Sequence, residues 1–141
     1  MYRYRVIILK ARQKKELKMM SRTEQLNQAL RTLQAGTPDL EASALVSEDG
    51  LMIASALPEH IEEDSAAGIC AVLLNLGSRV ATELNRGNLK QVFVQGDDGY
   101  IIMSKATDET VLMVVTNNLA KLGLIFLDMK KAVTDIRKII G

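Results

Sequence analysis

The sequence has few of the residues from which catalytic and metal sites are usually built. Its 141 residues include one cysteine, Cys70, one histidine, His60, and no tryptophan. A lone cysteine forms no internal disulfide bond and is too little for a zinc cluster, and one histidine excludes a site of paired histidines. Glycine-rich phosphate loops of the P-loop and dinucleotide-binding types are also missing. With no secretory signal, these absences favour a cytoplasmic protein.

The apolar residues are sufficient for one hydrophobic core of ordinary size. They make up 48% of the chain, against 25% charged residues, a balance typical of a folded domain. No uninterrupted apolar run approaches about 18 residues, so we expect neither a membrane-spanning helix nor stable membrane insertion. We find no repeats or linkers and therefore predict a single domain over residues 21–141.

Charge is unevenly distributed along the chain. Residues 1–20 carry a net charge of +6, whereas residues 21–141 carry −5. An acidic body is poorly suited to nucleic acid, because that affinity comes mostly from neutralising phosphates. The basic leader could contact an anionic membrane or RNA. We favour a different hypothesis, in which translation starts at Met19 or Met20 and the leader is upstream sequence; an intact mass that includes Met1 would contradict it.

The order of helical and strand patterns predicts an α+β fold. Ser21 and Glu24 form a capping-box pattern for a helix that Gly36 and Pro38 end. Adjacent strands joined by tight turns indicate an antiparallel sheet rather than a doubly wound one, and the order is α-β-β-α-β-β-β-α. The expected segments after the first helix are strands 40–46 and 51–56, helix 62–85, strands 89–95, 100–105 and 111–116, and a last helix capped by Asn117 or Asn118 that buries Leu119, Leu122, Phe126, Met129, Val133, Ile136 and Ile140.

Helix 62–85 carries more apolar surface than a surface helix needs. One stripe consists of Ala66, Ile69, Leu73, Leu76, Val80 and Leu84. A second stripe is rich in small residues and consists of Ala67, Ala71, Leu74, Ser78 and Ala81, with Cys70 and Gly77 between the two. We expect one face to meet the sheet and the small-residue face to need another partner. The chain has no spare element for it, so a second copy across a two-fold axis is the economical answer.

Candidate catalytic and metal-binding residues all have simpler structural explanations. The acidic cluster 62–64 lies at a helix start, where the helix dipole favours negative charge. The turn that contains Asp97 and Asp98 is too short for a calcium loop. We expect Cys70 to be buried as a small hydrophobe and His60 to be exposed in a loop. The sequence therefore predicts a non-enzyme without cofactor or metal.

Four segments in order resemble the Roadblock dynein light-chain family, in its bacterial MglB-like branch. Residues 47–55, SEDGLMIAS, resemble its hairpin motif, and residues 64–84 resemble its alanine-rich central helix. Residues 87–92, GNLKQV, resemble the entry to its third strand, and residues 119–123, LAKLG, resemble the start of its last helix. The resemblance covers nearly all of the chain after the leader.

The resemblance implies a Roadblock/profilin-like fold and a dimer. The expected sheet has five antiparallel strands, with the central helix on one face and the terminal helices on the other. Members of the family dimerise by pairing central helices and joining third strands, which makes one continuous ten-stranded sheet. The interface residues that we predict on this basis are Ala67, Cys70, Ala71, Leu74, Gly77, Ser78, Ala81, Val92, Phe93 and Val94.

The resemblance also implies a function. Relatives in the MglB-like branch bind a small Ras-like GTPase and stimulate its hydrolysis, and eukaryotic relatives are dynein subunits or scaffolds. We expect a non-catalytic homodimer that regulates such a GTPase by positioning its switch loops, although Arg79 or Arg86 could supply an arginine in trans. Alternatives are a structural scaffold or motor-complex subunit, a heterodimer with a paralogue, and a small-ligand sensor, which the lack of convergent polar core residues disfavours. The candidate docking residues are Asn75, Arg79, Thr82, Glu83 and Arg86.

Overall fold

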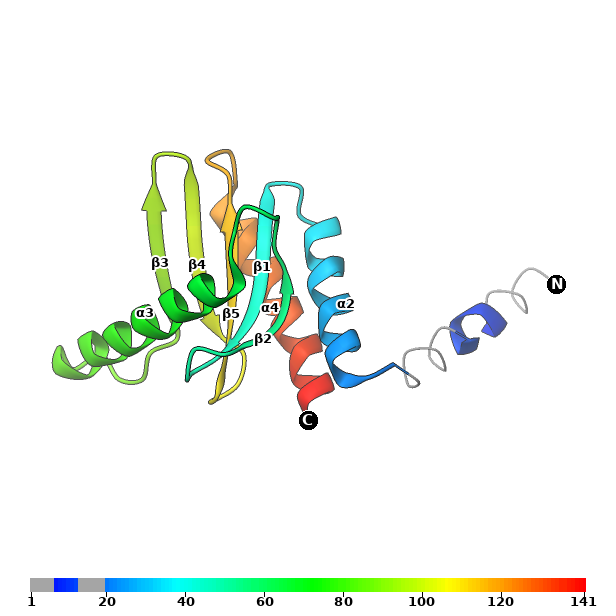
Figure 1. Cartoon of the computed structure of the whole chain (residues 1–141), viewed down its shortest axis with the longest axis horizontal. Helices are drawn as coiled ribbons and strands as arrows, with labels where there is room; N and C mark the ends of the chain where they lie inside the picture. The colour runs from blue at the N-terminus through cyan, green and yellow to red at the C-terminus, as the bar shows by residue number, and fades with distance from the viewer. Residues whose placement is uncertain (1–6, 13–19) are drawn as a thin grey trace.

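The computed structural model describes residues 7–12 and 20–141 (Figure 1). The prediction about the leader and a start at Met19 falls largely outside the described residues; residues 7–12 form an exposed helical segment. The remaining elements are helix α2 (Arg22–Ala35), strands β1 (Leu40–Ser47) and β2 (Met52–Ala56), helix α3 (Glu63–Glu83), strands β3 (Gln91–Gly96), β4 (Gly99–Lys105) and β5 (Thr110–Thr116), and helix α4 (Leu122–Ile140).

The five strands form one antiparallel sheet in the order β2-β1-β5-β4-β3. The two central strands, β1 and β5, are buried along almost their whole length. Their continuous apolar runs are typical of strands that are covered on both faces. The predicted fold class, element order and antiparallel pairing are confirmed.

Helices cover both faces of the sheet (Figure 1). Helices α2 and α4 pack together on one face, where the larger buried cluster includes Leu30, Leu45 and Ile136. Helix α3 crosses the other face, over a smaller cluster that includes Val46 and Met103. Over residues 20–141, one layer thus contains two helices and the opposite layer contains one, as the family resemblance implied.

The predicted start and end of the first helix are confirmed. The Ser21 side-chain oxygen accepts a hydrogen bond of 3.2 Å from the backbone N–H of Glu24, so one orphan donor of the first turn is satisfied. At the other end, Gly36 donates its N–H back to helix carbonyls. The local sequence therefore sets both ends of α2.

The predicted start of the last helix is wrong. Helix α4 begins at Leu122 with Lys121 as its N-cap. Asn117 instead stabilises the loop before the helix, because its side chain accepts from the N–H of Leu119 at 2.9 Å and donates to Asp39 at 3.1 Å. Leu119 therefore lies outside the helix, with 76% of its surface exposed. The predicted stripe is corrected at Phe126 as well, which is exposed, whereas Ile125 is buried.

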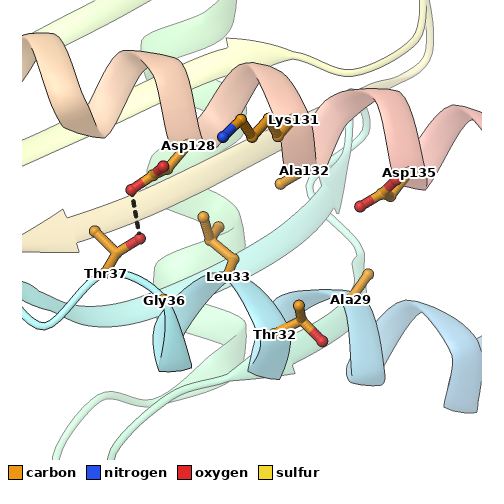
Figure 2. A pocket seen from close by; sticks show the side chains of 9 residues that line it. All are labelled: Ala29, Thr32, Leu33, Gly36, Thr37, Asp128, Lys131, Ala132 and Asp135. Carbon is orange, nitrogen blue, oxygen red and sulfur yellow. Dashed lines mark hydrogen bonds between the residues drawn. The ribbon is translucent and has the colours of Figure 1, made fainter.

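A partly buried hydrogen bond connects the turn after α2 to α4. Thr37, which follows α2, is buried and donates from its hydroxyl to Asp128 Oδ2 of α4 at 2.8 Å (Figure 2). A pocket of about 230 Å³ lies beside this bond and also contacts Lys131 and Asp135 of α4. The two helices thus share polar contacts as well as an apolar core.

Helix α3 is long and apolar enough to cross a membrane by length and composition alone, with a mean hydropathy of 1.3. The length of uninterrupted apolar runs alone therefore does not exclude a helix of membrane-spanning length and composition. In the fold, one side of α3 packs on the sheet at Ala67, Cys70 and Leu74. The sheet side of α3 is thus part of the core of the domain.

Candidate interaction surface

Large apolar side chains lie exposed along one flank of α3, beside the side that packs on the sheet. Their exposed fractions run from 48% to 66%, and their spacing of 3, 4, 4 and 4 residues places them on one helix face. We call this set the outer stripe, which consists of Ile69, Val72, Leu76, Val80 and Leu84. A contiguous exposed apolar surface of this kind marks an interaction site in soluble proteins.

The prediction of which face of α3 points outward is wrong. The small-residue stripe lies on the sheet. Of the other stripe, Ile69, Leu76, Val80 and Leu84 are exposed, whereas Ala66 is buried and Leu73 is half-buried. Close packing of the helix explains this arrangement: a Cβ added at Gly77 would come within 2.9 Å of Val92 Cγ2 and 3.1 Å of Leu89 Cδ2. Large residues on this side would push the helix away from the sheet, so the small residues face inward.

The predicted interface residues therefore divide into three groups. Ala67, Cys70 and Leu74 are buried in the chain's own core and offer no accessible surface. Phe93 and Val94 of β3 are exposed. The half-buried members, which line the junction between α3 and the sheet, are Ala71, Gly77, Ser78, Ala81 and Val92.

The two edge strands of the sheet, β2 and β3, differ in the hydrogen bonds that their backbones form. At the β2 edge, Asn27 of α2 accepts a hydrogen bond of 3.2 Å from the N–H of Ser55. Within residues 20–141, no side chain forms a hydrogen bond with the backbone of β3. Strand β3 is exposed at all but one of its residues. Because an open edge can pair with another strand, β3 is the edge available for pairing.

A hollow connects the outer stripe to the open edge. It has a volume of about 390 Å³ and lies between the second half of α3 and the start of β3. Leu76, Val80 and Leu84 form one wall, and Leu89 and Val92 form the other. The helix face and the strand edge are thus parts of one continuous apolar surface.

The candidate docking residues lie where the sequence predicts, in solvent. Asn75, Arg79, Thr82, Glu83 and Arg86 are all exposed. Arg79 Nε and Glu83 Oε1 form an ion pair of 2.9 Å one helical turn apart. Helical spacing places Asn75, Arg79 and Glu83 along one flank of the outer stripe, so the surface has an apolar centre and a polar rim.

The only thiol shows no sign of reactivity. Burial raises the pKa of Cys70 from 9.0 to about 11, which disfavours the nucleophilic thiolate. Its Sγ lies 3.1 Å from Met113 Sδ in the core. Among residues 7–12 and 20–141, no group of three His, Cys, Asp or Glu side chains is placed to hold a metal ion.

Comparison with known proteins identifies the family. The model of the Roadblock/LC7 domain matches residues 26–116. The chain belongs to the Roadblock/LC7 family. The protein MJ0310 of Methanocaldococcus jannaschii is 33% identical to it over 101 residues, which is 72% of this chain and 88% of the relative.

Solved structures confirm the Roadblock fold. Myxococcus xanthus MglB superposes with a TM-score of 0.78 at 24% identity, over 84% of this chain and 89% of that one. A structure described as MglB with a tetrameric arrangement gives 0.76 at 18% identity, over 85% and 90% of the two chains. At these identities the likeness shows the fold, and self-association is a property of that relative.

Val72 is the surface residue that the sequence reasoning missed. It belongs to neither predicted stripe, yet 66% of its surface is exposed within the outer stripe. The signal was its spacing of four residues from Leu76 and eight from Val80, which continues the large aliphatic series toward the helix start. Size of side chain, in addition to periodicity, would have identified it.

Proposed function

We propose that this Roadblock protein is a non-catalytic homodimeric regulator or adaptor that binds a small Ras-like GTPase and modulates its nucleotide cycle. The observation that carries the proposal is the continuous surface of the outer stripe, the hollow and the open β3 edge. A surface of this extent needs a partner, and a second copy brings an identical helix face and an identical strand edge. Isologous pairing of two copies would cover the helix face and the strand edge of each copy at once.

Pairing through this surface would create a new composite surface. Two α3 helices would lie side by side, and two β3 strands would join their sheets into one of ten strands. The outer stripes would become buried between the copies. The polar rim at Asn75, Arg79 and Glu83 would stay at the border of the pair, so we place the GTPase contact there.

Regulation by positioning fits the side chains better than regulation by a donated arginine. Arg79 is held in an ion pair with Glu83, and Arg86 bonds to the neighbouring carbonyl of Asn85 at 3.2 Å. Arg79 lies on the helix itself, and the Arg86 side chain folds back onto the backbone of the loop that follows it. We infer that the dimer holds the switch loops of the GTPase in one arrangement, which shifts its nucleotide cycle through differential binding.

Binding of the purified full chain to a Ras-like GTPase tests the proposal. The GTPase is loaded with GDP or with a non-hydrolysable GTP analogue, and calorimetry measures the affinity of each state. We expect tighter binding of one state and a stoichiometry of one GTPase per dimer. Single-turnover hydrolysis at saturating dimer then measures the effect on the cycle.

Two outcomes would contradict the proposal. Equal affinity for both nucleotide states would favour the alternative of a structural scaffold or motor-complex subunit. A chain that sediments as a monomer at high concentration would remove the composite surface altogether.

A further inference from the structure

A second unassigned surface lies on the opposite face of the sheet from α3. A groove of about 530 Å³ runs between α4 and the adjoining ends of β3 and β4. We call it the basic groove, because four of the side chains that line it are Lys90, Lys105, Lys130 and Arg137. It shares only its end near Leu89 and Gln91 with the hollow beside the outer stripe.

The basic groove concentrates positive charge on an acidic body. No Asp or Glu is among its lining residues, although residues 21–141 carry a net charge of −5. Within the described residues, the one recorded ion pair is Arg79–Glu83, on α3. None of the four cations forms an ion pair with a carboxylate of the described residues.

Helix α4 separates its charges between its two flanks. Asp128, Asp135 and Lys131 line the pocket that faces α2 (Figure 2). Lys130 and Arg137, seven residues apart, line the basic groove on the other flank. The two acidic residues have the same spacing, so the helix presents a mixed-charge side and a purely basic side.

One of the basic side chains is held in place. Arg137 Nε donates a short hydrogen bond of 2.6 Å to the backbone carbonyl of Ala106, which follows β4. This bond uses one of the five N–H donors of the guanidinium group and fixes the position of the group. The other four donors remain available to a ligand. A preorganised guanidinium loses less freedom on binding a carboxylate than a free one.

The floor of the groove is apolar. Phe126, Met129 and Val133 of α4 contribute to it. Gln91 of β3 also lines the groove, and strand alternation places Phe93 on the same face of the sheet. Phe93 stacks on Tyr100 with ring centroids 5.3 Å apart, so this face of the β3–β4 hairpin carries an aromatic pair.

We propose that the basic groove binds an acidic segment of a partner protein, with carboxylates at its rim and aliphatic side chains on its floor. Charge complementarity selects carboxylates, and the apolar floor selects a chain that carries aliphatic groups between them. Nucleic acid fits less well, because the surrounding body is acidic. This inference does not rest on the GTPase proposal, since the groove and the outer stripe lie on opposite faces of the sheet.

The experiment uses the full chain and labelled peptides of stated composition. The probe is a fluorescein-labelled peptide of repeated Glu-Glu-Leu units, and the matched peptides carry Gln or Lys in place of Glu. Fluorescence anisotropy measures affinity at low and physiological salt. We expect the Glu peptide to bind the wild-type chain and the Gln peptide to bind at least about tenfold more weakly.

Two double variants with the same change of charge test the location. Lys90→Glu with Lys130→Glu reverses two groove residues, and Lys121→Glu with Lys131→Glu reverses two exposed lysines outside it. The groove variant should lose at least about tenfold in affinity for the Glu peptide and the control less than about twofold. The groove variant should also gain affinity for the Lys peptide. Thermal melting confirms that both variants fold.

Three results would overturn the inference. Equal losses in the two variants would mean diffuse electrostatic attraction, and equal binding of the Glu and Gln peptides to the wild-type chain would remove the need for carboxylates. Oligothymidylate or phosphatidylglycerol vesicles are the remaining arms. Tighter binding of either one, lost in the groove variant, would assign the groove to a different class of ligand.

Discussion

Helices α3 and α4 have similar lengths and cover opposite faces of the same sheet, yet their surroundings differ. They contain 21 and 19 residues. Helix α4 shares its layer with α2, and a partly buried hydrogen bond connects it to the turn after α2. Among the described helices, α3 is alone in its layer, and it exposes an apolar stripe along most of its length. The domain is complete on one face and incomplete on the other.

This difference shows why apolar content alone does not locate an interaction site. Both helices have apolar residues beyond those that meet the sheet, and α4 also exposes Leu124 and Leu127. On α4 they occupy the first half of the helix, whereas on α3 they continue from Ile69 to Leu84. The continuous stripe next to an open strand edge is the feature on which we base the proposal of a second copy.

The largest expected effect comes from charge on the two sides of α3. Leu74 is buried on the sheet side, so Leu74→Asp should destabilise the fold by about 3–5 kcal/mol or prevent folding, because the carboxylate has no partner there. Leu76 is 56% exposed on the outer stripe, so Leu76→Asp should keep the fold and abolish self-association. Circular dichroism and sedimentation velocity measure the two effects.

Asn75→Asp is the control for charge on α3 outside the stripe. It adds a carboxylate at an exposed rim position between the two test sites and should leave both folding and self-association unchanged. Hydrogen exchange adds a second readout, since β3 amides should be protected in the wild-type dimer and exchange rapidly in Leu76→Asp. A folded Leu76→Asp dimer with protected β3 amides would show that the stripe is not the interface.

The next prediction tests whether water is excluded from the contact between α3 and the sheet as it is from the contact between α4 and the sheet. Burial raises the pKa of Cys70 from 9.0 to about 11, so the folded state keeps the proton that the unfolded state loses above pH 9. This contribution is fully present below pH 9 and is lost as the pH rises through 11. The free energy of unfolding should fall by up to about 1.4 kcal/mol per pH unit in that window.

Urea unfolding of the wild-type chain and of Cys70→Ala separates the contribution of Cys70 deprotonation from that of lysine and tyrosine titration. The variant should be less stable at pH 8 because of the cavity, but its stability should change less between pH 9 and pH 11. Identical pH slopes for the two proteins would mean that water reaches Cys70 and that α3 packs loosely on the sheet.

The fold could be predicted from the sequence because its local signals agree with one another. Ser21 and Glu24 mark the start of α2, and the polar turn at residues 47–50 fixes the first hairpin. The start of α4 was missed because Asn117 has two plausible uses. It caps the loop and contacts Asp39, 78 residues away in sequence, and such a distant partner leaves no periodic signal.

The orientation of α3 could not be read from periodicity. Both stripes repeat with helical spacing, and either could lie on a sheet. The distance between helix and strand decides, and Gly77 against Val92 shows how small that distance is. A sequence pattern carries the direction of each side chain around the helix axis, but not the space available on either side. The polar rim was predicted correctly because charged residues stay in solvent for either orientation.

The hydrogen bond between Thr37, after α2, and Asp128 of α4 is expected to stabilise the two-helix layer. Thr37→Val removes the donor to Asp128 Oδ2 and should lower the free energy of unfolding by about 1–2 kcal/mol. Thr32→Val, in the same pocket wall but exposed, is the matched control and should change it little. Neither change should affect self-association, which we assign to the other face. A loss of dimer in Thr37→Val would mean that the two faces are coupled.

The smallest expected effect on stability is at the rim of α3. Arg79→Gln breaks an ion pair whose side chains are 75% and 64% exposed, and exposed pairs one turn apart contribute only about 0.3–0.5 kcal/mol. Thermal melting should therefore barely change. If the rim contacts the GTPase, affinity for a GTPase that binds the wild-type dimer should still fall by about tenfold, while hydrolysis at saturation stays near the wild-type rate because the arginine is not donated to the reaction. A large drop in the saturated rate with unchanged affinity would instead make Arg79 a catalytic arginine and replace positioning as the mechanism.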